Sequence, residues 1–255
     1  MTSRRVTVSI VSHGQTGLLD RLLGDLLGLH GAAIERIVVT LNLGEAWQGP
    51  ANAQPPITVM RNARPLGFAE NHNAAFSLCD TPLFAVLNPD LRIASDPFTP
   101  LSSAFDGDAA CGLAAPLQRD EAGAIEDFRR RLPTPWALTR RAWARLTGAR
   151  RPLTSTPRAE WLAGAFMLFD SNAFRQLGGF DTRYRLYCED VDICLRLQLG
   201  GWRLAVDEQT QVVHAAQRGS GRHLRYLIWH LQSLLRLWTS APYWRWLLLR
   251  RRSVT

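Results

Sequence analysis

Three carboxylates lie within four positions of the chain, at Glu189, Asp190 and Asp192. Acidic residues are favoured in the first turn of a helix, and that explanation suits Asp192 well. It explains Glu189 and Asp190 less easily, because an aromatic-rich stretch, 180–187, directly precedes them. Crowded carboxylates raise one another's pKa, and a raised pKa suits a general base. These residues alone leave helix capping and proton transfer both open.

Another acid, Asp90, follows a short apolar run. Residues 83–87 are all apolar and lie between Pro82 and Pro89, which predicts a strand buried on both faces. Proline cannot donate to a sheet ladder, so the strand should end there and leave Asp90 at its carboxyl edge, where ligands of open α/β sheets usually bind. The pattern predicts that Asp90 holds a divalent cation on a phosphorylated substrate, with a plain turn at the Asn-Pro dipeptide as the alternative.

The elements that would position these acids follow from apolar periodicity. In the first half we expect strands at 6–11, 37–41, 57–60 and 83–87, with helices at 18–27 and 68–79. Strand and helix alternate there, which predicts βαβ units in an α/β fold with a mostly parallel central sheet flanked by helices.

The second half of the chain is more irregular. We expect strands at 111–115, 161–169, 202–206 and 211–213, and helices at 171–176 and 190–199. The stretch 118–157 is rich in Arg, Pro and Trp and has no assignable pattern. Long segments of this kind inside a compact domain are often functional, so it is a candidate acceptor-binding insertion.

The chain of 255 residues carries a net charge of +8, and all its basic residues are arginine apart from six histidines. This charge permits nucleic acid, anionic lipid or phosphorylated small molecules as partners. We attribute the absence of lysine to a GC-rich genome, so the charge is weak evidence about partners. No nucleic-acid-binding motif accompanies it, and we expect no nucleic-acid partner.

The four cysteines form no C-x-x-C pair, so we expect them to be reduced, as in the cytosol. No signal-peptide segment or run of 18 apolar residues occurs, and we expect neither export nor a membrane span. Residues 224–238 show an apolar helical stripe, which we expect to pack on the core. The last ten residues combine Trp, Leu and Arg, as interfacial membrane anchors do. Packing on the core or on a second subunit is the alternative for this pair of helices.

Seven motifs, in one order, carry a resemblance to a known family. They are Val6–Ser12, Leu66-Gly67-Phe68-Ala69, Leu87-Asn88-Pro89-Asp90, Trp161 to Ala165, Leu177 to Asp181, Glu189-Asp190-Val191-Asp192 and Gly201-Trp202-Arg203. Over about residues 6–215 the chain resembles glycosyltransferase family 2, in particular its bacterial rhamnosyltransferase-like branch.

The resemblance implies a GT-A nucleotide-diphospho-sugar transferase fold. Residues 1–215 would form the catalytic domain, with a nucleotide-binding half at about 1–115 and an acceptor-binding half at about 116–215. Residues 216–255 would form a C-terminal helical segment able to associate with a membrane.

The resemblance also implies roles for individual residues. Asp190 takes the place of the general base and Glu189 that of a neighbouring acid that orients the base or acceptor. Asp90 and His214 would hold Mg²⁺ or Mn²⁺, with a histidine satisfied at a strand end as the alternative for His214. The residues expected around the nucleotide sugar are Ser12, His13, Asn42, Gly67, Asn71, Asn73, Asn88, Asp90, Arg218 and Arg222. Those expected around the acceptor are Trp161, Gly164 and Glu189.

One departure concerns the donor. Many relatives carry an Asp before the residue that matches Asn42, whereas this chain has Leu41 there, so its choice of donor is open. The expected function is inverting transfer of rhamnose or another hexose or deoxyhexose from a dTDP-, UDP- or GDP-sugar. The acceptor would be a glycan or lipid-linked glycan in surface polysaccharide synthesis, at the cytoplasmic face of the inner membrane.

The alternative is a non-catalytic protein of the same fold that binds nucleotide sugar or nucleic acid. The presence of Asp90, Glu189, Asp190 and His214 together argues against it. The sugar, the acceptor, the linkage and the oligomeric state stay open at this point.

Overall fold

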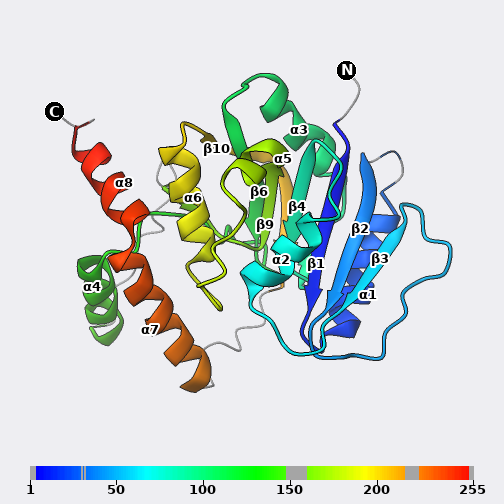
Figure 1. The fold of residues 1–255 in the computed structure, drawn as a ribbon, viewed down its shortest axis with the longest axis horizontal. Helices are drawn as coiled ribbons and strands as arrows, with labels where there is room; N and C mark the ends of the chain where they lie inside the picture. Colours follow the sequence, from blue (N-terminus) through cyan, green and yellow to red (C-terminus); the bar gives the residue numbers. More distant parts are fainter. Residues whose placement is uncertain (1–3, 30, 32, 148–159, 216–223, 253–255) are drawn as a thin grey trace.

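A computed structural model describes residues 4–29, 31, 33–147, 160–215 and 224–252 (Figure 1). Its strands are β1 (Val6–Ser12), β2 (Ile34–Leu41), β3 (Ile57–Arg61), β4 (Leu83–Leu87), β5 (Leu91–Arg92), β6 (Cys111–Arg119), β7 (Arg129–Arg130), β8 (Trp161–Leu162), β9 (Phe166–Asp170) and β10 (Arg203–His214). Its helices are α1 (Thr16–Leu27), α2 (Phe68–Phe76), α3 (Phe98–Asp106), α4 (Pro135–Leu146), α5 (Ser171–Gln176), α6 (Glu189–Leu199), α7 (Leu224–Thr239) and α8 (Ala241–Arg252).

The central sheet has eight strands in the order β3-β2-β1-β4-β9-β6-β10-β5. Strands β3, β2, β1 and β4 are mutually parallel, and β6 is parallel to β10. Strand β9 runs antiparallel between β4 and β6, and β5 is antiparallel to β10. This arrangement confirms an α/β fold with a mostly parallel sheet, and it gathers the carboxyl ends of β1, β2 and β4 at one edge.

Two cores lie on the two faces of the sheet. Along β4, Leu83, Ala85 and Leu87 belong to one core, while Phe84 and Val86 belong to the other. Successive side chains of a strand point to opposite faces, so a strand with no polar residue serves both cores. Helices α1 and α3 cover the first face, and α2, α5 and α6 cover the second (Figure 1).

The second half contains more structure than the sequence predicted. The two short strands expected at 202–206 and 211–213 are one strand, β10, which pairs with β6 on both sides of a register shift between Asp207 and Gln211. The run expected as one strand at 161–169 is divided into β8 and β9. The unassigned stretch 118–157 contains the end of β6, all of β7 and helix α4.

The loop that leads into α6 packs closely on the start of α2. The amide N–H of Phe68 donates to the carbonyl of Arg185 at 3.2 Å. A Cβ added at Gly67 would lie 2.7 Å from that carbonyl oxygen and 3.2 Å from Arg185 Cα. Both contacts are with main chain, which cannot rotate away, so this approach requires glycine.

Replacing Gly67 by Ala is therefore expected to lower the free energy of unfolding by about 1–3 kcal/mol, the usual cost of an overpacked contact. Gly17→Ala is the matched control, because Gly17 lies in α1 and a Cβ there meets nothing within 4 Å. The control is expected to stabilise the protein by about 0.5–1 kcal/mol through helix propensity. Urea unfolding of both variants measures the difference, and equal stabilities would show that the loop moves aside freely.

The C-terminal helices cover part of the second core. Leu234 and Leu237 of α7 and Tyr243 of α8 are buried, and the indole of Trp238 donates to the Pro133 carbonyl at 2.6 Å. Helix α7 packs on the core, but not through the apolar stripe that predicted this contact. Four residues of that stripe, Leu227, Ile228, Leu231 and Leu235, are exposed instead. Within the described ranges, no helix is both long and apolar enough to cross a bilayer. All four cysteines are free thiols.

Candidate active site

Asp90 and His214 meet at the carboxyl edge of β4. Asp90 lies in the turn between β4 and β5, and the β5–β10 pairing sets His214 opposite Leu91. The amide of Ala215 donates to the Asp90 carbonyl at 2.9 Å. These contacts bring His214 Nε2 to 3.3 Å from Asp90 Oδ1.

His214 has a second acidic neighbour, Glu126, whose Oε2 lies 2.7 Å from His214 Nδ1. Burial by itself lowers the pKa of His214, but the two carboxylates outweigh it and raise the pKa to about 9. Sequence reasoning missed Glu126, because it lies in the stretch 118–157 that has no pattern. A carboxylate on one nitrogen of a histidine fixes the ring and leaves the other nitrogen directed at a ligand.

The Asp90–His214 pair is chemically suited to a divalent cation. Asp90 Oδ1 is buried, and within the described residues it accepts no hydrogen bond of acceptable geometry. When the His214 imidazole is protonated, its positive charge lies between the carboxylates of Asp90 and Glu126. A divalent cation bound to Asp90 and to the neutral imidazole could replace that proton. The described residues contain no cluster of three or more acidic, histidine or cysteine side chains that could hold a metal. Further oxygen ligands would therefore have to come from water or a diphosphate, as is usual for Mg²⁺.

Glu189 and Asp190 form the first turn of α6. The two residues before them, Tyr187 and Cys188, have positive φ angles of 71° and 66°. Such angles are costly for residues other than glycine and persist only where the surroundings impose them. Asp190 Oδ1 accepts from the Val191 amide at 2.8 Å, and Oδ2 accepts from the Gly164 amide at 3.2 Å.

The two acids differ in exposure and in hydrogen bonding. Glu189 is buried, and its Oε2 has no hydrogen-bond partner among the residues that the structure describes. Asp190 is partly exposed and accepts two amide bonds. Burial raises the pKa of both groups, and the neighbouring Asp190 raises that of Glu189 further. The amide bonds favour the charged form of Asp190. The fold therefore disfavours the charged form of Glu189 more strongly than that of Asp190.

The raised pKa of Glu189 predicts a pH-dependent effect of Glu189→Gln on stability. Because the pKa is higher in the folded than in the unfolded protein, folding takes up a proton between the two values. Stability is therefore lost as the pH rises through that interval. Glu189→Gln removes this loss, so its gain in melting temperature should be larger at about pH 8 than at about pH 5. Glu208→Gln, which removes an exposed partner of Arg129, is the control and should show no such pH dependence.

The linker between β8 and β9 joins the two acidic centres. Gly164 binds Asp190 as described, and the carbonyl of the next residue, Ala165, accepts from the Asn88 amide at 2.9 Å. The turn that carries Asp90 and the helix start that carries Asp190 are therefore held by consecutive residues. Asp192, in contrast, forms a 2.6 Å ion pair with Arg196 and is a structural residue of α6.

A network of buried amides lies at the ends of β1, β2 and β3. The Asn42 side chain accepts from Asn62 Nδ2 at 2.7 Å and lies 2.9 Å from His13 Nδ1. Asn62 Nδ2 also reaches Asn71 Oδ1 at 2.6 Å, and Asn71 donates to the Gly67 carbonyl at 2.9 Å. Asn42 and Asn71 are fully buried, so they support this edge of the sheet from inside the protein. His13 is exposed on the surface of the same edge.

Three other predicted residues have structural contacts. Ser12 is buried and accepts from the Gln15 amide at 3.2 Å. Asn73 clamps the main chain of Phe180, which donates to Asn73 Oδ1 at 2.9 Å and accepts from Nδ2 at 2.8 Å. Trp161 is buried, and its indole donates to the Arg131 carbonyl at 2.9 Å. Arg130 lies over the Trp161 ring at 5.2 Å and its charge lowers the pKa of Asp190, partly offsetting burial.

Comparisons with curated proteins identify relatives. The chain is 29% identical over 182 residues to rhamnosyltransferase WbbL of Escherichia coli strain K12, covering 67% of this chain and 69% of that protein. It is 32% identical over 154 residues to N-acetylglucosaminyl-diphospho-decaprenol L-rhamnosyltransferase of Mycobacterium tuberculosis, covering 54% of this chain and 48% of that protein. The chain is therefore a glycosyltransferase similar to these rhamnosyltransferases. It spans about half the length of the mycobacterial relative. No protein-family profile matches the chain.

Solved structures show the fold of this glycosyltransferase. The mannosyltransferase PcManGT of Pyrobaculum calidifontis, solved with GDP-Man and Mn²⁺, superposes with a TM-score of 0.62 at 17% identity, covering 92% of this chain and 65% of that one. GalNAc-T7, solved with UDP, GalNAc and Mn²⁺, gives 0.61 at 17% identity, covering 83% and 44%. At such identities the likeness establishes the GT-A fold alone.

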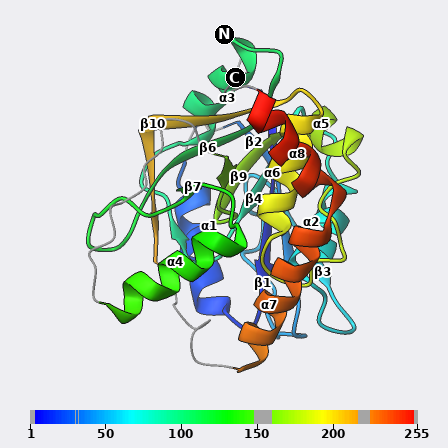
Figure 2. The same ribbon diagram turned by 90° about the vertical axis from the view of Figure 1, so that its left-hand side faces the viewer.

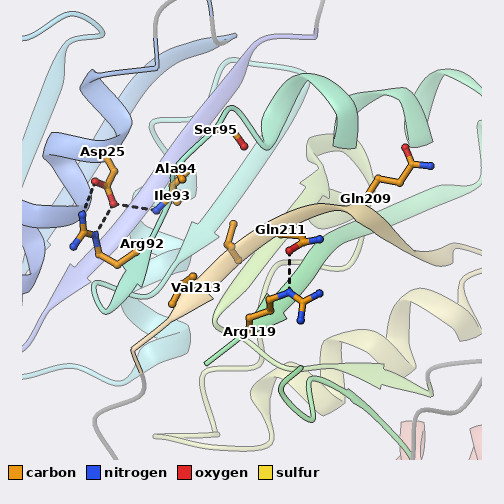
Figure 3. A pocket seen from close by; sticks show the side chains of 10 residues that line it. Asp25, Arg92, Ile93, Ala94, Ser95, Arg119, Gln209, Gln211 and Val213 are labelled. Atoms are coloured by element: carbon orange, nitrogen blue, oxygen red, sulfur yellow. Dashed lines mark hydrogen bonds and ion pairs between the residues drawn. The ribbon is translucent and has the colours of Figure 1, made fainter. Parts of the chain in front are cut away.

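A separate groove of about 440 Å³ lies on the β5–β10 ladder of the glycosyltransferase (Figure 3). Arg92 and Val213 line it, whereas their neighbours on the same strands, Leu91 and His214, do not. None of the predicted site residues lines it. Arg218 and Arg222, expected at the donor, lie outside the described residues.

Proposed function

We propose that this glycosyltransferase transfers rhamnose, or another hexose or deoxyhexose, from a nucleotide-diphosphate donor to a lipid-linked glycan with inversion. The observation that carries the proposal is the linker 163–165, which holds the Asp90 turn and the Asp190 carboxylate side by side. A cation-binding acid and a proton-accepting acid are what displacement of a diphosphate by a hydroxyl requires. The names of the relatives support rhamnose as the sugar and a diphospho-lipid-linked sugar as the acceptor.

The reaction assigns different tasks to the two centres. Asp190 accepts the proton of the acceptor hydroxyl as its oxygen bonds to the anomeric carbon of the sugar. The bond from that carbon to the diphosphate breaks, and the nucleoside diphosphate leaves with the electron pair. Glu189 is protonated in this scheme and therefore places no second negative charge beside the base. It also orients Asp190.

Asp90 and His214 would hold Mg²⁺ or Mn²⁺, with Glu126 orienting the imidazole. The cation supplies Lewis-acid stabilisation of the negative charge that develops on the diphosphate. Neighbours of the same fold contain Mn²⁺ and nucleotide sugars or nucleotides, which supports this assignment.

The donor would lie along the edge formed by β1, β2 and β4. The residues proposed there are Ser12, His13, Asn42, Gly67, Asn71, Asn73, Asn88 and Asp90. Arg218 and Arg222 are proposed to close over the diphosphate. Gly164, Glu189 and Trp161 would border the acceptor, with the buried Trp161 acting through Arg130 above its ring. Residues 1–215 would be the catalytic domain, working at the cytoplasmic face of the inner membrane.

A panel of nucleotides tests the proposal. Melting curves with dTDP, UDP and GDP, each with and without Mn²⁺, should show one nucleotide that stabilises the protein, and more so with the cation. Stabilisation by none of the three would contradict the donor site. A non-catalytic protein would bind the nucleotide but release none from the matching nucleotide sugar when a lipid-linked acceptor is supplied.

A further inference from the structure

Helices α4, α7 and α8 lie together on one side of the molecule (Figures 1 and 2). The Trp238 indole of α7 donates to the Pro133 carbonyl, just before α4, at 2.6 Å. The Trp244 indole of α8 donates to the Trp238 carbonyl at 2.8 Å. These contacts connect the three helices, so their outer surfaces form one face, which we name the α4–α7–α8 face.

Large apolar side chains are exposed on this face. Helix α7 has two apolar stripes: Leu234 and Leu237 pack on the core, while a second stripe consists of exposed Leu227, Ile228, Leu231 and Leu235. Its leucines recur every fourth residue and therefore lie in one row along the helix. Trp136 and Trp143 of α4 are 76% and 70% exposed, and Trp244 of α8 is 56% exposed. Sequence reasoning assigned such a surface to the last ten residues alone.

The same helices are strongly basic. Their sequences contain nine arginines and no aspartate or glutamate. Arg225 and Arg236 border the exposed stripe of α7, and Arg140 and Arg245 are exposed on α4 and α8. An ion pair with Glu160 engages Arg250. Tryptophan, leucine and arginine together on helices without acids match the headgroup layer of an anionic bilayer.

We propose that the α4–α7–α8 face docks on the surface of an anionic phospholipid bilayer. The exposed leucines and tryptophans enter the headgroup boundary, and the arginines contact lipid phosphates. This charge argues for lipid as the occupant over a second copy of the chain, because two such basic faces would repel each other.

On its inner side, helix α7 contacts the loop that leads into α6. Ser233 of α7 donates to the Leu186 carbonyl at 2.8 Å, and the Arg185 guanidinium lies 4.7 Å from the centre of the Trp229 ring. Glu189 and Asp190 follow that loop directly. If the proposed function holds, a lipid-linked acceptor at the bilayer surface reaches the catalytic base beside this contact. The docking itself does not depend on the proposed function.

Sedimentation with vesicles tests the proposal. The full chain should pellet with phosphatidylcholine vesicles that contain about 30% phosphatidylglycerol and stay in solution with phosphatidylcholine alone. The double variant Leu231→Glu/Leu235→Glu should lose at least about tenfold in bound fraction. Trp136→Glu/Trp143→Glu should lose binding too, which separates this face from an anchor in the last ten residues.

Charge reversal supplies a matched control. Arg236→Glu changes the charge by two units on the face and should weaken binding roughly tenfold or more. Arg21→Glu makes the same change on α1, on the opposite face of the sheet, and should bind as the wild type does.

Two results would overturn the proposal. One is that the wild-type chain stays in solution when the anionic vesicles are pelleted. The other is a dimer in analytical ultracentrifugation that Leu231→Glu/Leu235→Glu converts to monomer while vesicle binding is unchanged. Nucleotide-induced melting shifts, measured on the same variants without vesicles, report on the donor site and so keep failure of docking distinct from failure of the proposed function.

Discussion

Replacing Asp190 by Asn is expected to reduce sugar transfer by about 10²–10⁴-fold while nucleotide binding stays close to the wild-type value. Asp190 is the partly exposed member of the acid pair, and its two amide bonds favour the charged form that can accept a proton. The amide of asparagine has nearly the same shape but cannot accept that proton. The turnover number should therefore fall with little change in the melting shift produced by the nucleotide.

Glu189→Gln is the matched control for this variant. Glu189 is buried beside Asp190, and burial raises its pKa well above the usual range, so the fold disfavours its charged form. Its neutral isostere should retain much more activity than Asp190→Asn retains. The reverse order of activities would assign the base to Glu189.

Turnover should also depend on pH in a defined direction. The pKa of Asp190 is raised by burial, and the base must be charged to accept a proton. Activity of the wild type should therefore fall as the pH is lowered through that raised pKa, and this limb should be missing from the residual activity of Asp190→Asn. Initial rates measured between about pH 5 and pH 9 provide the test.

Asp90→Asn and His214→Ala are expected to abolish the part of nucleotide binding that requires a divalent cation, with a loss of roughly 10²–10³-fold in turnover. Asp90 Oδ1 is buried, accepts no hydrogen bond of acceptable geometry from the described residues, and lies 3.3 Å from His214 Nε2. The melting shift caused by nucleotide with Mn²⁺ should shrink to the value measured with EDTA.

Glu126→Gln tests the residue that orients His214. Partners of this kind typically change metal affinity by about 10–100-fold, so this variant should need more Mn²⁺ to reach the same melting shift. His230→Ala is the histidine control, because His230 packs on Tyr187 away from Asp90 and should leave the Mn²⁺ requirement unchanged. A full Mn²⁺-dependent shift in Asp90→Asn would show that the cation binds elsewhere.

Local sequence patterns determined the parts of this protein that depend on neighbouring residues. The apolar run 83–87 between two prolines predicted β4 with its observed bounds, and the alternation of strands and helices predicted the α/β sheet. The acids at 189–192 predicted the start of α6. Periodicity and capping act within a few residues, so they can be read without knowledge of the fold.

Only the tertiary structure decided which distant residues meet. Glu126 reaches His214 because β6 and β10 are parallel neighbours, and no local pattern marks it. For Asp192 the sequence already favoured a structural role at the helix start, and the structure adds its partner, Arg196. Burial disfavours the charged form of Glu189 more than that of Asp190, and burial depends on packing from the whole chain. The apolar stripe of α7 was visible in the sequence, but only packing showed that Leu227, Ile228, Leu231 and Leu235 in it are exposed.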